Sequence, residues 1–179
     1  MITEKDIDNA LAALKTAIMG KSAKTQQILY DWLLKWGRYI SRESGFDPKT
    51  LPRYKRGDVL YVDFGFNIGA EYGGIHYAVV VEPDNKKSSG NILVVPLTSI
   101  EKGKSQADVN GVDVYVGDDV IDGSGFATVA KPNQVRAISK MRIIKPLSGK
   151  SKLKRLTGEQ LQLIDDKLSE FVSRKSVDK

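Results

Sequence analysis

His76 and Thr98 are the side chains of this 179-residue chain best suited to proton-transfer chemistry. His76 is the only histidine and follows a glycine-rich loop, and Thr98 follows an apolar run. An imidazole that titrates near neutral pH can take or give a proton, and a hydroxyl can donate a hydrogen bond to a developing negative charge. Because both residue types also occur in strands for purely structural reasons, the pair defines a candidate site and not yet an activity.

RNA is a substrate that suits these two groups. Its own 2′-hydroxyl attacks the neighbouring phosphorus once a base removes the proton, so the protein supplies position, proton transfer and charge stabilisation. The chain has no cysteine and a single histidine, which excludes cysteine nucleophiles and thiolate metal sites and argues against a zinc site. We therefore expect neither a metal nor another cofactor.

Positive charge gathers in one part of the sequence. The formal net charge is +6, and the segment 123–158 contains nine basic residues and no acidic residue. The nine are Lys131, Arg136, Lys140, Arg142, Lys145, Lys150, Lys152, Lys154 and Arg155. Such a run is either the footprint of a polyanion partner or the solvated face of a basic protein, and charge alone does not distinguish the two.

Three apolar, β-branched runs are predicted to form consecutive strands that position the candidate residues. They span residues 59–64, 75–81 and 92–97. If the second and third strands pair, His76 and Thr98 meet at one end of the sheet. Residues 65–72 are too many for a tight hairpin, and a loop of this length on a rigid sheet is where binding groups usually gather.

Proline and glycine residues mark the predicted ends of strands and the turns in the rest of the β region. Pro96 lies inside the third run and cannot donate a ladder hydrogen bond, which predicts an edge strand or a bulge there. Residues 125–138 predict one or two further strands interrupted at 131–133, and Asn110-Gly111 predicts a turn. Residues 139–144 fit no element clearly.

Helical periodicity is found at both ends of the chain. Thr3 with Asp6 forms a variant capping box for a first helix that ends at Gly20, and a second periodic segment ends near Gly45. A capping box that begins at Thr157 predicts a last helix.

Trp32 and Trp36 lie on the second predicted helix. Their rings either pack into a core, which we expect, or form a groove for the helix of another protein. Residues 46–55, with two prolines, indicate a linker. We expect a helical extension over residues 1–50 and a β domain over residues 53–175.

The sequence has no feature of export or membrane insertion. No apolar run approaches the ~20 residues needed to span a bilayer. The first ten residues, MITEKDIDNA, contain acidic residues where a signal peptide carries basic ones. We expect a cytoplasmic protein that does not associate with a membrane.

Several segments taken together resemble the MazF/PemK family of toxin endoribonucleases. They are RGDVLYVDF at 56–64, GAEYGGIH at 69–76, AVVV at 78–81, VVPLTS at 94–99, QVRAI at 134–138 and KMRI at 140–143. The resemblance covers about residues 53–174. It implies a mainly β fold with helices, of the α+β class, in which an SH3-like, partly open β-barrel carries a C-terminal helix and follows an N-terminal helical hairpin that lies outside the family's usual core.

The resemblance also implies an activity. Family members usually work as homodimers that cleave single-stranded RNA at short sequences without metal, leave a 2′,3′-cyclic phosphate, and are restrained by a cognate antitoxin protein. The catalytic arginine of the family falls on His76, the catalytic threonine on Thr98, and the loop serine on Ala70. The residues expected to contact RNA are Phe66, Glu71, Ser99, Gln134, Arg136 and Lys140.

Two departures from the family pattern keep an alternative open. His76-Tyr77 in place of Arg-Pro removes a permanent cation, and Ala70 removes a hydroxyl donor. Either His76 transfers the proton here or the enzyme is weakened. The leading hypothesis is a toxin-type endoribonuclease, and the alternative is a non-catalytic relative that binds RNA or a protein target such as DNA gyrase.

Overall fold

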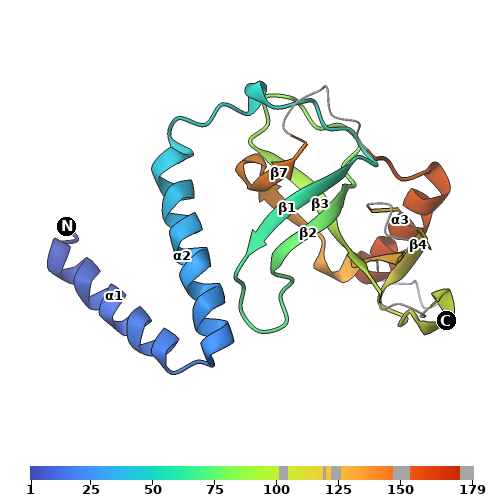
Figure 1. The fold of residues 1–179 in the computed structure, drawn as a ribbon. Helices are drawn as coiled ribbons and strands as arrows, with labels where there is room; N and C mark the ends of the chain where they lie inside the picture. The colour runs from blue at the N-terminus through green and yellow to red at the C-terminus, as the bar shows by residue number, and fades with distance from the viewer. Residues whose placement is uncertain (101–104, 119, 122–125, 147–153, 174–179) are drawn as a thin grey trace, which may run out of the picture. The chain divides into compact units, whose positions relative to one another are not determined.

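Antiparallel strands bring distant segments of the chain together in one sheet (Figure 1). The computed structural model describes residues 1–100, 105–118, 120–121, 126–146 and 154–173. Within these ranges the sheet contains seven strands, β1 (Val59–Gly65), β2 (Gly74–Val80), β3 (Asn91–Ser99), β4 (Val114–Asp118), β5 (Ala127–Ala130), β6 (Arg136–Ser139) and β7 (Ile143–Lys145). Their order is β4-β5-β3-β2-β1-β7, and β6 pairs with a different part of β3 from β5.

The helices complete the set of elements. They are the α-helices α1 (Glu4–Met19), α2 (Ala23–Glu43) and α3 (Gly158–Val172), and the short 3-10 helices η1 (Pro48–Thr50), η2 (Gln106–Asp108), η3 (Pro132–Gln134) and η4 (Lys140–Arg142). All three predicted α-helices are present, and Thr3 and Thr157 form the capping boxes expected at α1 and α3. The expected fold class is confirmed: an SH3-like, partly open β-barrel with a C-terminal helix follows an N-terminal pair of helices.

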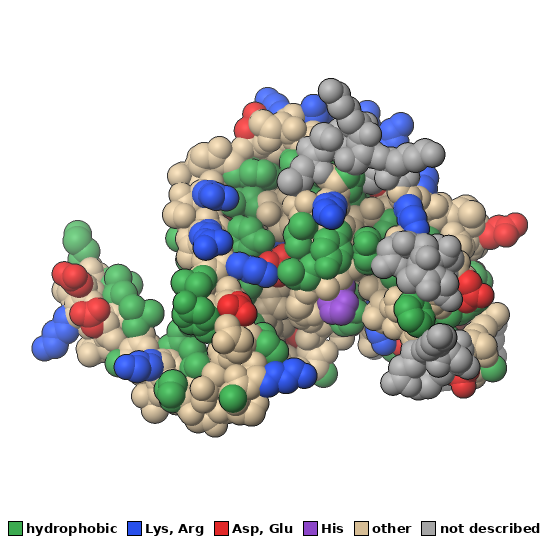
Figure 2. Space-filling view, in the orientation of Figure 1, with side chains coloured by type: hydrophobic (Ala, Val, Ile, Leu, Met, Phe, Trp, Pro, Cys, Tyr) green, Lys and Arg blue, Asp and Glu red, His purple; other side chains and the backbone are tan. Residues whose placement is uncertain are grey.

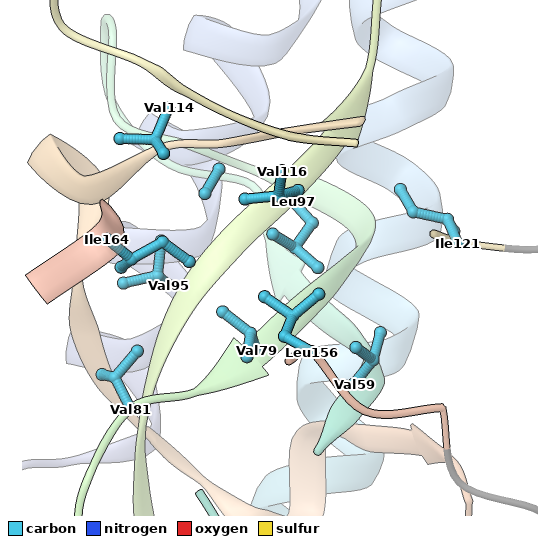
Figure 3. Close-up of a cluster of buried hydrophobic side chains, with 11 residues drawn as sticks. Val59, Val79, Val81, Val95, Leu97, Val114, Val116, Ile121, Leu156 and Ile164 are labelled. Carbon is cyan, nitrogen blue, oxygen red and sulfur yellow. The ribbon is translucent and has the colours of Figure 1, made fainter. Parts of the chain in front are cut away.

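Successive residues of each strand point to opposite faces of the sheet, and the apolar ones form two hydrophobic clusters, one on each face. The helix-side cluster contains Val59, Val79, Val81, Val95, Leu97, Val114, Val116, Ile121, Ala130, Leu156 and Ile164 (Figure 3). The Tyr54-side cluster contains Tyr54, Leu60, Val62, Phe64, Ala78, Val80, Ile92, Val94, Ile138 and Ile143. The fully buried Ile164 of α3 closes the first cluster, so the helix is held by its apolar face.

Pro96 lies in the interior of the sheet, so the prediction of an edge or a bulge there is wrong. Pro96 pairs with Ala78 of β2 in a regular register. On its other side, β3 changes neighbour from β6 to β5, and the carbonyl oxygen of Pro96 accepts a hydrogen bond from the amide of Lys131 at 2.9 Å. Pro96 therefore lies at the point where η3 separates β6 from β5. No strand carbonyl there needs a hydrogen bond from the N–H that proline lacks.

The expected linker is partly built into the barrel. Tyr54 is fully buried, its hydroxyl donates to the carbonyl oxygen of Pro146 at 2.7 Å, and Leu51 packs against the Tyr54-side cluster. By its internal contacts the chain divides into two compact units, Met1–Phe46 and Asp47–Lys179. Residues 47–55 therefore belong to the barrel unit.

The first unit consists of α1 and α2, and neither helix contains a buried residue. Trp32 is partly buried and packs near Tyr39, with ring centroids 6.3 Å apart, but Trp36 is 48% exposed. The expected core packing of both tryptophans is therefore wrong for Trp36, because two helices are too few to enclose a core. No helix in the described part of the chain is long and apolar enough to cross a membrane.

The basic segment does not form one charged face. The Lys140 side chain is 1% exposed and donates to the carbonyl oxygen of Lys86 at 3.0 Å, and Arg155 is paired with the buried carboxylate of Asp58. Arg142 donates to carbonyl oxygens of β1. Several of these side chains thus hold the fold, and Lys150 and Lys152 lie outside the described residues.

Candidate active site

The pairing of β2 with β3 places His76 and Thr98 at the same end of adjacent strands. Tyr77 lies opposite Leu97, and His76 and Thr98 are the next residues along their strands. Alternation puts both on the face of Ala78, which belongs to the Tyr54-side cluster. The structure therefore brings these two predicted residues together on one face of the sheet.

Two glycines shape the loop that leads into β2. A Cβ on Gly73 would lie 2.8 Å from the carbonyl oxygen of Gly65, so the loop closes onto β1 only with glycine there. Gly74 has a φ of 81°, and a Cβ there would lie 3.5 Å from Nε2 of His76. The imidazole is thus held directly against the backbone of the loop.

Tyr72 lies beside both His76 and Thr98. Its ring centroid is 4.6 Å from that of His76, and it packs edge-on against Phe64 at 5.8 Å. Its hydroxyl oxygen is buried and has no hydrogen-bond partner of ordinary geometry among the described residues. Burial raises the pKa of Tyr72, the nearby Thr98 hydroxyl partly offsets the rise, and the charge of Asp113 adds to it. The Tyr72 hydroxyl is therefore a neutral group next to Thr98.

His76 is a half-buried imidazole whose edge reaches the surface, with hydrophobic side chains beside it (Figure 2). Burial lowers the pKa of His76 from its usual 6.5, and a hydrogen bond to the backbone of Gly73 opposes part of this effect. At neutral pH the neutral imidazole is the main form, and a neutral imidazole is a proton acceptor.

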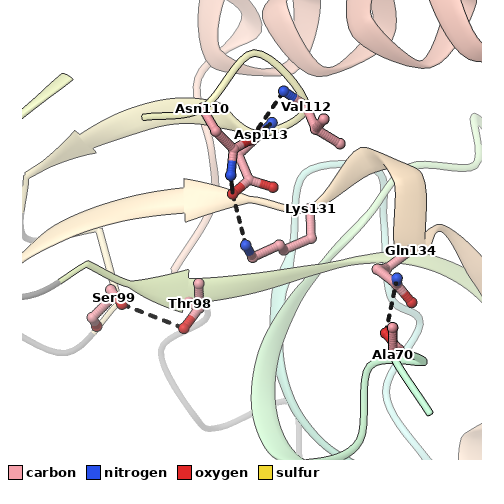
Figure 4. Close-up of polar contacts among 8 residues, drawn as sticks. All are labelled: Ala70, Thr98, Ser99, Asn110, Val112, Asp113, Lys131 and Gln134. Carbon is pink, nitrogen blue, oxygen red and sulfur yellow. Dashed lines mark hydrogen bonds and ion pairs between the residues drawn. The ribbon is translucent and has the colours of Figure 1, made fainter. Parts of the chain in front are cut away.

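Gln134 ties the loop to the rest of the barrel (Figure 4). Its Oε1 accepts from the amide of Tyr72 at 3.0 Å, and its Nε2 donates to the carbonyl oxygen of Ala70 at 3.4 Å. Arg136 donates to the same Oε1 at 3.0 Å, and its guanidinium lies 5.6 Å from the ring centroid of Phe64. These contacts bring a permanent cation to the face that carries His76.

A second cation near the site is neutralised. Nζ of Lys131 lies 2.6 Å from Oδ2 of Asp113, whose side chain is 8% exposed (Figure 4). The same carboxylate accepts from Nδ2 of Asn110 at 3.1 Å, in the turn that the sequence predicts. This pair therefore offers a phosphate less attraction than an unpaired lysine does.

The other predicted RNA contacts are distributed unevenly. Phe66 is half-buried at the start of the loop, and Glu71 is exposed on it. Ser99 is exposed next to Thr98, and its backbone carbonyl oxygen accepts from the Thr98 hydroxyl at 3.4 Å. Lys140 is not part of this site, because its ammonium group is buried against the connection between β2 and β3. Burial also lowers the pKa of Lys140.

Tyr72 and the ion pair of Lys131 with Asp113 also belong to this site, and the sequence does not single them out. An aromatic residue between a glutamate and two glycines was a usable signal for Tyr72, since a large ring rarely occupies a solvated loop without packing. The ion pair joins the residue before β4 to the residue after β5, and no local pattern predicts that pairing.

The polar functional groups at this site are an imidazole, hydroxyls and a guanidinium. Among the described residues, no group of three or more His, Asp or Glu side chains is arranged to hold a metal ion. The chemistry that these groups can perform is proton transfer and stabilisation of an oxyanion.

Several solved structures are similar to this chain. MazF (Form-I) from Deinococcus radiodurans is 19% identical, with a TM-score of 0.50 over 68% of this chain and 97% of that chain. MazE-MazF (Form-II) from the same organism is 16% identical, with a TM-score of 0.47 over 69% and 99%. Toxin MazF-mt6 of Mycobacterium tuberculosis is 11% identical, with a TM-score of 0.41 over 63% and 93%. No curated protein matches this chain significantly.

The family assignment comes from the sequence of the barrel unit. The family described as "PemK-like, MazF-like toxin of type II toxin-antitoxin system" matches residues 55–172, a stretch that contains His76, Thr98, Gln134 and Arg136. The match covers about two thirds of the chain and leaves the two N-terminal helices outside it. This chain belongs to the PemK-like, MazF-like family of type II toxins.

Proposed function

We propose that this chain is a toxin endoribonuclease that cuts single-stranded RNA at short sequences without a metal ion. The observation that supports it best is the position of His76 and Thr98 at the same end and on the same face of adjacent strands. A neutral imidazole, a hydroxyl and the Arg136 guanidinium on that face match what 2′-hydroxyl attack requires.

In the proposed reaction, neutral His76 takes the proton of the 2′-hydroxyl as its oxygen attacks the adjacent phosphorus. The hydroxyl of Thr98 and the guanidinium of Arg136 stabilise the charge that builds up on the phosphorane oxygens. The bond from phosphorus to the 5′-oxygen then breaks, and that oxygen takes a proton from water. The products are a 2′,3′-cyclic phosphate and a free 5′-hydroxyl.

Two further parts of the proposal concern partners. The family is one of toxins from toxin-antitoxin systems, so we expect a cognate antitoxin protein that restrains the activity. We also expect the barrel units to form a homodimer with RNA bound across the interface, and light scattering that shows a monomer at tens of micromolar contradicts this expectation.

The direct test is to incubate the purified protein with a long RNA in EDTA and to map the ends of the fragments. Fragments with 5′-hydroxyl and 2′,3′-cyclic phosphate ends at a recurring short sequence support the proposal. Intact RNA, or cleavage that EDTA abolishes, contradicts it.

A second candidate function is favoured by the residues at the site. Position 76 holds a half-buried imidazole with a lowered pKa, and Ala70 offers no hydroxyl, so the site lacks two groups of the family pattern. A relative that binds RNA or a protein without cutting RNA fits this loss. Binding of RNA by a parent protein that never cleaves it, together with cleavage by the His76→Arg variant, identifies this case.

A further inference from the structure

A basic groove lies at the opposite end of the β2–β3 pair from His76. It has a volume of about 570 Å³ and is lined by Lys49, Arg53, Lys86, Lys87 and Ser88. The last three residues belong to the connection between β2 and β3, whereas His76 and Thr98 lie near the start of β2 and the end of β3. The groove is therefore separate from the candidate active site.

Buried groups hold the floor of this groove in place. Asn85 is 3% exposed, and its Nδ2 donates to the carbonyl oxygen of Asn91 at 2.9 Å. The buried ammonium of Lys140 donates to the carbonyl oxygen of Lys86 at 3.0 Å. On the other wall, the carboxylate of Asp47 caps η1 by accepting from the amide of Lys49 at 2.9 Å. The lining residues thus come from a backbone that is fixed locally on both sides.

The charge of the groove is positive and largely uncompensated. Arg53 is paired with Asp84 at 2.7 Å, with both side chains more than half exposed. Lys49, Lys86 and Lys87 have no ion pair in the described part of the chain, and all three are exposed. Glu82, the other acid of the β2–β3 connection, accepts from the amide of Leu93 at 3.3 Å. A polyanion in solution therefore meets at least three unpaired cations here.

We propose that this groove binds phosphates of the RNA backbone at a distance from the point of cleavage. Lysine ammonium groups are hydrated point charges that suit phosphates without reading bases, and the five lining residues include no aromatic ring on which a base can stack. The volume is that of a site for a nucleotide-sized group. The choice of RNA over other polyanions rests on the proposed function.

The geometry sets a length requirement on the RNA. Asn91 and Thr98 are separated by seven steps along β3, roughly 24 Å at ~3.4 Å per residue. A strand that occupies the active site and the groove together must therefore be several nucleotides long. A short oligonucleotide reaches only one of the two sites.

The test compares Lys86→Ala/Lys87→Ala with the matched control Lys21→Ala/Lys24→Ala, which removes two exposed lysines from the first unit. Affinity is measured for single-stranded RNAs of about 20 and about three nucleotides as salt is varied. The groove variant should bind the long RNA about five- to tenfold more weakly. Its salt slope should fall by about 1.4, which is about 0.7 for each phosphate that a lysine no longer neutralises. It should bind and cut the short RNA as the parent does.

Three outcomes overturn the groove proposal. One is an unchanged affinity of the groove variant for long RNA, and another is an equal loss in the control, which indicates only net charge. The third is normal RNA binding with loss of binding to an acidic protein partner. In each case cleavage of the short RNA by the parent leaves the proposed function standing. A parent that neither binds nor cuts either RNA contradicts both proposals.

Discussion

A histidine at position 76, where the resemblance to the family implies an arginine, has a charge that depends on pH. Burial favours the neutral imidazole and lowers the pKa of His76, so the group is a base over most of the physiological range. An arginine there stays charged and stabilises the phosphorane without taking a proton. The two residues imply different pH dependences of the same reaction.

The first prediction is an acid-side inflection in the rate of RNA cleavage. Because the folded pKa of His76 lies below 6.5, cleavage should be constant above that pH and should fall as pH drops through the lowered pKa. Protonation of His76 also disfavours the folded state. Its contribution to the free energy of unfolding is therefore fully present above pH 6.5 and is lost as pH falls through the lowered pKa. Single-turnover rates between about pH 4.5 and 8 check this, and the His76→Arg variant should lack the inflection.

The second prediction concerns Gln134, whose side chain holds the loop. Gln134→Ala removes the hydrogen bonds to Tyr72 and Ala70. The free energy needed to open the loop locally should then fall by about 1–2 kcal/mol. The amide of Tyr72 should then exchange with solvent about tenfold faster, and RNA cleavage should slow. Asn133→Ala, at the exposed neighbouring position, should change neither. Equal exchange rates in the two variants count against this role.

At the scale of single residues, the sequence could be read only in part. His76 and Thr98 stand out because their types carry chemistry, and strand alternation puts both on one face of the sheet. Their catalytic role stays a prediction. Lys140 was misplaced because charge alone does not show that a long side chain is buried against a carbonyl oxygen. Tyr72 was missed because its role depends on the ring of His76, which the loop brings close in space.

At the scale of elements, the loop between β1 and β2 depends on close backbone approach. A Cβ at Gly73 would lie 2.8 Å from a backbone oxygen of β1, which cannot move aside as a side chain can. The loop that carries Tyr72 and the start of β2 must then shift.

The third prediction follows from this close approach. Gly73→Ala should destabilise the fold by about 1–3 kcal/mol and reduce cleavage more than RNA binding. Gly90→Ala, in the connection between β2 and β3, meets no atom within 4 Å and should change stability by less than about 0.5 kcal/mol. Chemical denaturation of both variants checks this, and equal midpoints argue against the close approach.

Element types could be predicted because their signals are local. β-branched runs, capping boxes and the Asn110 turn are read from a few neighbouring residues, and the structure contains each of them. The error at Pro96 has a non-local cause, since only the change of partner from β6 to β5 makes a proline acceptable in an interior strand.

At the scale of the whole molecule, the boundary between the two units is set by packing rather than by composition. Prolines and lack of periodicity suggested a linker over residues 46–55. Tyr54 instead belongs to the core of the barrel, which moves the start of this unit to Asp47. Packing also explains why the basic segment does not form one charged face. Several of its side chains make hydrogen bonds or ion pairs within the barrel unit.

The fourth prediction tests this boundary with two truncations. A fragment that starts at Asp47 should unfold cooperatively at nearly the temperature of the parent barrel. A fragment that starts at Arg56 loses the ring of Tyr54 and should be less stable by about 3–5 kcal/mol. Calorimetry of both fragments is the measurement, and equal stabilities contradict the inclusion of residues 47–55 in the barrel.

The central claim is that His76 and Thr98 together carry out metal-independent RNA cleavage, and the most direct test is single-turnover cleavage in EDTA by the parent and by His76→Ala and Thr98→Ala. Each substitution should slow cleavage by about 10- to 1,000-fold while RNA affinity stays nearly unchanged. Cleavage by His76→Ala at the rate of the parent contradicts the claim.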